Sequence, residues 1–89
     1  MFFNKKSKLL KEILDDSKEL LSGDDYENAL ILVDNNESLL ALELVCEQLY
    51  EYDVNVPMGF YEKIESAGKY YDLDAKKLNL VLKLVVSDS

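Results

Sequence analysis

The sequence lacks histidine, arginine and tryptophan, and it has a single cysteine, Cys46, and a single proline, Pro57. Without histidine, the usual general base at neutral pH is missing, and without arginine no side chain can grip a phosphate through two parallel hydrogen bonds. A small protein that depended on an oxidising compartment would carry an even set of bridge-forming cysteines. We therefore expect a non-enzymatic protein that uses no cofactor and works in the reducing cytoplasm.

Long apolar runs are absent as well. Charges at Lys8, Lys11 and Glu12 interrupt the first apolar stretch before it reaches the roughly 7 residues that an export signal needs. No run approaches the roughly 18 apolar residues of a membrane span. With 48% apolar residues, the 89-residue chain can still build a core, so residues 1–89 are expected to form one domain without membrane contact.

Basic residues are scarce in the middle of the chain. Residues 12–62 contain fourteen acidic residues and one lysine, Lys18, which gives this segment a formal charge of −13. A field of this size repels nucleic acid and anionic lipid, and it attracts basic proteins at a rate that depends on salt. We expect a basic protein partner and no nucleic-acid binding.

Apolar residues recur at helical spacing along most of the chain. The spacing predicts helices over about residues 4–22, from Asp24 or Asp25 to about 33, over 37–52, over 57–71 and from Asp74 to about 85. Gly23 is expected to end the first helix in a left-handed cap. The run VLKLVV at 81–86 is β-branched enough for a strand, but helix is favoured because no partner strand is evident. These elements predict an all-α protein, a compact bundle of about four to five short helices.

The helix predicted over residues 37–52 carries apolar residues on two sides. At about 100° per residue, one side faces the core and consists of Leu39, Leu42, Val45, Cys46 and Leu49. Leu40 and Leu44 point nearly the opposite way, among glutamates. Two explanations stay open: a central helix that is packed on both sides, or an exposed leucine pair that serves a homodimer or a secondary interface.

The glutamates of this helix, Glu43, Glu47 and Glu51, are four residues apart and line one edge. Acid–base catalysis would need a cleft and a positive orienting group, and neither is evident. A metal ion would need ligands that wrap around it, which one rigid helix edge cannot provide, so no metal is expected. Cys46 lies beside Glu43 and Glu47, which favours a buried apolar role over that of a nucleophile.

Tyrosines give the end of this helix a different character. Tyr50 and Tyr52 flank Glu51, and Asp53 follows. Tyrosine suits contact surfaces, because its large ring loses few rotamers on binding and its hydroxyl can donate a hydrogen bond. Aromatic rings among carboxylates are unsuited to RNA but can match a lysine- and arginine-lined nuclease cleft.

Residues 41–74, ALELVCEQLYEYDVNVPMGFYEKIESAGKYYDLD, resemble the MafI family of bacterial immunity proteins. The family tends to show a run like A-L-E-x-L-C-[DE]-Q-L-Y-[ED], a short extended link and a tyrosine-bearing helix. The matching residues here are Ala41, Leu42, Glu43, Cys46, Glu47, Gln48, Leu49, Tyr50 and Glu51, followed by Tyr61, Ile64 and Gly68. The chain departs from the family in lacking a tryptophan in its last helix and in carrying Pro57 after the link, so the cognate target stays open.

The resemblance implies a small cytoplasmic antidote that binds and occludes the C-terminal toxin domain delivered by neighbouring bacteria. Several toxins associated with such proteins look like nucleases, including RNases of the EndoU type, and some of the antidotes are thought to act as dimers. The residues expected to contact the toxin are Glu43, Glu47, Tyr50, Glu51, Tyr52 and Asp53. The alternative is an acidic adaptor, or a nucleic-acid mimic, that regulates an endogenous basic partner.

Overall fold

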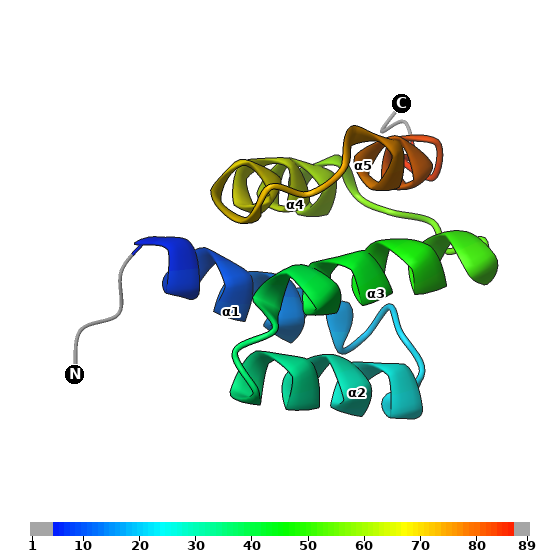
Figure 1. Cartoon of the computed structure of the whole chain (residues 1–89). Coiled ribbons are helices and arrows are strands. Elements are labelled where there is room, and N and C mark those ends of the chain that lie inside the picture. Colours follow the sequence, from blue (N-terminus) through cyan, green and yellow to red (C-terminus); the bar gives the residue numbers. More distant parts are fainter. Residues whose placement is uncertain (1–4, 87–89) are drawn as a thin grey trace.

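The computed structural model describes residues 5–86, and within them the chain forms five α-helices (Figure 1). In chain order these are α1 (Lys5–Ser17), α2 (Gly23–Asp34), α3 (Ser38–Glu51), α4 (Met58–Tyr71) and α5 (Ala75–Leu82). The all-α prediction is confirmed, and the predicted bounds of the third and fourth helices agree with α3 and α4 to within one residue at each end.

The first helix ends earlier than the sequence predicts. The carbonyl of Ser17 accepts hydrogen bonds from the backbone N–H groups of Leu20 and Leu21, both at 2.9 Å, so the chain turns away after Ser17. Gly23 is the first residue of α2 and not a left-handed cap. The prediction that Asp24 or Asp25 caps this helix is also wrong, because Ser22 does so.

Ser22 caps α2 through its hydroxyl oxygen, which accepts a hydrogen bond from the backbone N–H of Asp25 at 3.2 Å. Asp24 and Asp25 lie in the first turn, where their negative charges interact favourably with the helix dipole. Serine at the N-cap satisfies one of the four N–H groups that a helix start leaves without a partner. The two aspartates are thereby placed at the exposed start of α2.

Helix α3 is the centre of the bundle, because it packs against α2, α4 and α5. Its buried residues are Ala41, Leu42, Val45, Cys46 and Leu49. The other helices add Leu10, Ile13 and Leu14 from α1, Ala29 from α2, Phe60, Ile64 and Ala67 from α4, and Val81 from α5. The second apolar side of α3 is only partly explained by this packing: Leu44 is half-buried against the core, whereas Leu40 is 47% exposed.

The last helix ends earlier than the sequence predicts. Helix α5 ends at Leu82. Its N-cap is Asp74, as predicted, and the Asp74 side chain accepts a hydrogen bond from the backbone N–H of Lys76. Beyond Leu82, Val85 forms an isolated parallel bridge with Val56, which donates to the carbonyl of Leu84 at 3.0 Å. The prediction of helix to about residue 85 was wrong, because Val56 in the link between α3 and α4 provides a bridge partner for Val85 that the sequence did not reveal.

Two isoleucines test this description of the core. Ile64 in α4 is fully buried, whereas Ile31 in α2 is 55% exposed. Ile64→Ala should lower the free energy of unfolding by about 2–5 kcal/mol, because it removes buried apolar contacts and leaves a cavity. Ile31→Ala should change it by less than about 0.5 kcal/mol. Urea denaturation followed by circular dichroism measures both, and equal losses would contradict the assignment of the core.

Candidate functional site

The predicted acidic edge of α3 does not lie free in solvent along its whole length. Glu47 forms an ion pair with Lys77 of α5, with 3.0 Å between Oε2 and Nζ. The hydrogen bond to Glu47 raises the pKa of Lys77, and the charges of Glu47 and Glu43 act in the same direction. Glu43 itself is half-buried. Glu47 therefore serves the α3–α5 contact, and Lys77 partly neutralises it.

The end of α3 is open, and it presents four consecutive exposed residues. Tyr50 is 44% exposed and Tyr52 is 65% exposed, while Glu51 and Asp53 are exposed between and after them. The chain reverses at Asp53, which has a φ of 50°, and the backbone N–H of Val54 then donates to the carbonyl of Leu49 at 3.0 Å. The left-handed residue and this hydrogen bond end the helix, and residues 50–53 are exposed there.

The start of α2 adds two acids that the sequence analysis did not connect with this surface. The side-chain amide of Gln48 donates to both carboxylate oxygens of Asp25 at 3.0 Å, which ties α3 to the first turn of α2. Asp24 is exposed beside it. The start of α2 and the end of α3 lie at the same end of the molecule in Figure 1. The short 35–37 turn, which joins the two helices as an antiparallel pair, is the signal that would have shown this.

We call this surface the acidic end, and it comprises Asp24, Asp25, Tyr50, Glu51, Tyr52 and Asp53. Four of its members belong to the predicted contact set. Glu43 and Glu47 lie outside it, further back along α3 beside α5. Of the predicted second surface, Leu40 is exposed, whereas Leu44 packs against the core.

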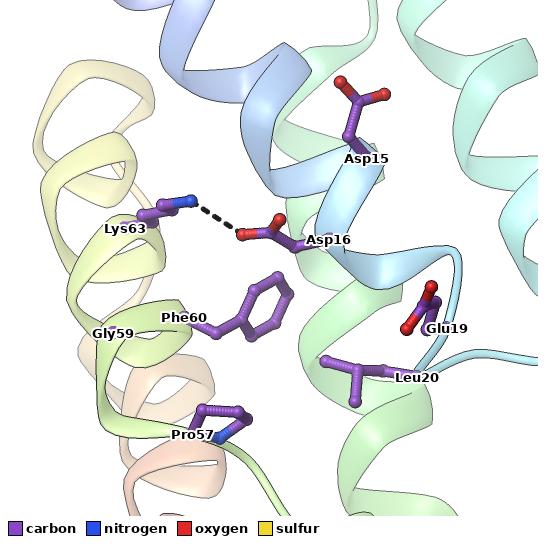
Figure 2. Close-up of a pocket in the computed structure, with 8 residues that line it drawn as sticks. All are labelled: Asp15, Asp16, Glu19, Leu20, Pro57, Gly59, Phe60 and Lys63. Atoms are coloured by element: carbon purple, nitrogen blue, oxygen red, sulfur yellow. Dashed lines mark hydrogen bonds and ion pairs between the residues drawn. The ribbon is translucent and has the colours of Figure 1, made fainter.

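A hollow lies between the end of α1 and the start of α4, with a volume of about 490 Å³ (Figure 2). One wall consists of Asp15, Asp16, Glu19 and Leu20, and the other of Pro57, Gly59, Phe60 and Lys63. Nζ of Lys63 lies 2.7 Å from Oδ2 of Asp16 and closes one side. We call it the α1–α4 hollow. The sequence alone does not reveal this hollow, because Asp16 and Lys63 are far apart along the chain and only the packing of α1 on α4 joins them.

Cys46 is fully buried, as predicted. Burial raises the pKa of its thiol to about 12, and the negative charges of Glu47 and Glu43 add to the effect. The thiol is therefore protonated and inaccessible near neutral pH, which is unfavourable for a nucleophile. Among residues 5–86, no three cysteine, aspartate or glutamate side chains form a group that could hold a metal ion.

Comparisons with protein-family models, with curated protein sequences and with solved structures found no match to this chain. In the part of the chain that the structure describes, no helix has the length and apolar character needed to cross a membrane.

The buried thiol predicts a specific response to alkaline pH. Because its pKa rises from the ordinary 9.0 to about 12 on folding, the thiol favours the folded state below pH 9, and this contribution is lost as pH rises from 9 to 12. The free energy of unfolding of the wild type should therefore fall more steeply above pH 9 than that of Cys46→Ala, by up to about 1.4 kcal/mol per pH unit. Urea denaturation at pH 8, 9, 10 and 11 measures the difference, and parallel curves would contradict it.

Proposed function

We propose that this protein is an immunity protein that binds a cognate nuclease toxin domain and neutralises it by stoichiometric occlusion. The observation that carries the proposal is the acidic end, where two exposed tyrosines stand among four carboxylates. Such a surface offers large apolar rings for contact and negative charge for recognition of a basic partner. The proposed toxin is a nuclease, for example an RNase of the EndoU type.

The mechanism follows from the chemistry of the proposed partner. A nuclease cleft is lined by basic side chains that bind phosphates, and it contains positions that hold bases. Glu51 and Asp53 can occupy the phosphate positions, and Tyr50 and Tyr52 can stack where bases would lie. The protein would then exclude the nucleic acid by filling its binding cleft, with no chemical step of its own.

Charge over the whole chain supports the partner class independently of these side chains. The formal net charge of the chain is −8. Residues 12–62, which include the acidic end, have a formal charge of −13. A negative surface accelerates encounter with a positive cleft, which matters for an inhibitor that must act before the nuclease does. The resemblance of residues 41–74 to MafI immunity proteins supports the same function from the sequence.

The alternative is an acidic adaptor or nucleic-acid mimic that acts on an endogenous basic protein. Its surface chemistry would be the same, so the partner decides between the two. An immunity gene is expected directly after a toxin gene with a secretion or adhesion module. Capture of the toxin domain encoded there supports the immunity function, and capture of an endogenous nucleic-acid-binding protein in its place supports the alternative.

Charge reversal tests the acidic end directly. The double variant Glu51→Lys, Asp53→Lys should weaken binding of the upstream-encoded toxin domain by about 10–100-fold, mainly through slower association, because both changes place positive charge against a positive cleft. Isothermal titration calorimetry and surface plasmon resonance measure affinity and rates.

The matched control is Asp34→Lys, Glu62→Lys, which has the same net charge but alters exposed residues at the end of α2 and on the outer side of α4. It should bind within about threefold of the wild type. Equal affinity of the two double variants would overturn the role of the acidic end.

A further inference from the structure

The α1–α4 hollow combines an apolar floor with an acidic rim. Phe60 forms the floor and is only 5% exposed, so the hollow is closed at its base. In Figure 2 its ring lies between Asp16 and Leu20, with Pro57 on the remaining side. An apolar floor of this kind does not suit a small hydrated cation, because it offers no oxygen ligands to replace the water that would be lost. It does suit the aliphatic stem of a long side chain.

Carboxylate oxygens on the rim have hydrogen-bonding capacity left. Lys63 contacts Oδ2 of Asp16, while no contact with a described residue uses Oδ1. The side chain of Glu19 forms neither an ion pair nor a hydrogen bond with another described residue. The carboxylate of Asp15 points away from the ring of Phe60 in Figure 2. Asp16 and Glu19 therefore place two negative charges beside the apolar floor. The single ammonium group of Lys63 balances only one of them.

A short segment of the chain links the hollow to the proposed contact surface. Pro57, in its wall, follows Asp53 of the acidic end by four residues along the chain. A protein partner commonly covers roughly 800 Å² on each side of an interface, so a partner seated on the acidic end can also extend over the hollow. The volume of about 490 Å³ is ample for one long side chain.

We propose that the α1–α4 hollow binds an arginine side chain of the protein partner. The stem would lie over Phe60 and Leu20, and the guanidinium would donate to Glu19 and to the second oxygen of Asp16. Arginine fits better than lysine, because its planar head has several donors that two carboxylates can share and because it is more weakly hydrated. The identity of the partner rests on the proposed function, whereas the preference of the hollow for arginine does not.

A small probe tests the hollow without the toxin. N-acetyl-arginine amide and N-acetyl-citrulline amide have nearly the same shape, but only the first is charged. In ¹H–¹⁵N spectra of the full chain, titration with the arginine compound should cause saturable shifts at the amides of Glu19, Leu20 and Gly59, and the citrulline compound should not. Absence of these shifts, or equal shifts with citrulline, would overturn the proposal.

Glycine substitutions provide a matched pair of variants. A Cβ at Gly59 or at Gly23 would meet no atom within 4 Å, so the first atom of a side chain is accommodated at either position, but only Gly59 borders the hollow. Gly59→Trp should abolish the arginine-dependent shifts at Glu19 and Leu20, and Gly23→Trp should preserve them. Glu19→Gln, a neutral substitution of nearly the same shape, should weaken them at least severalfold, with Glu62→Gln as the control. Retention of the shifts in both hollow variants would contradict binding there.

The same variants show whether the toxin uses the hollow. If the proposed function holds, Gly59→Trp should weaken toxin binding by about tenfold, since one anchoring side chain would lose its place. Wild-type affinity in Gly59→Trp would overturn the part of the proposal that assigns the arginine to the partner. If the wild type does not bind the toxin, the proposed function is wrong. The preference of the hollow for arginine is still decided separately, by the titration with the arginine compound.

Discussion

The packing of α3 between its neighbours is the constraint on which the rest of the structure depends. Leu42, Val45 and Leu49 are fully buried, and α2, α4 and α5 all pack against the helix that carries them. Apolar burial is the dominant favourable term in folding, so these helices are held where they cover α3. Most of the apolar side chains of α3 are thereby used in internal contacts, and its final turn presents consecutive exposed residues that can meet another molecule.

The arrangement of the helices then decides where charge collects. Because α2 runs antiparallel to α3, the acids in the first turn of α2 come to lie near those at the end of α3, with Gln48 and Asp25 as the link. Lys63 and Lys77 each pair with one acid and tie two helices together, which leaves the acidic end without a balancing lysine in an ion pair among the described residues. Like charge that no lysine balances opposes folding, and the proposed recognition of a basic partner would give the four carboxylates of the acidic end a role that folding does not require.

Local patterns predicted the helices well, and long-range contacts account for what they missed. Periodicity located α3 and the inward side of Cys46, because a helix face depends only on spacing along the chain. It could not show that Val56 would provide a partner for Val85, that Lys77 would engage Glu47, or that Asp16 would meet Lys63, since each pair joins segments that are distant in sequence. Two local features were missed as well: the turn in which the Ser17 carbonyl accepts from Leu20 and Leu21, and the capping of α2 by Ser22 in place of Asp24 or Asp25.

The central functional claim is that negative charge at one end of the bundle guides it onto a basic toxin. The salt dependence of association tests this claim most directly. Stopped-flow mixing of the wild type with the toxin domain encoded beside it should give an association rate constant that falls about tenfold or more between about 50 and 500 mM NaCl, while the dissociation rate constant changes little. An association rate constant that does not depend on salt would contradict the claim.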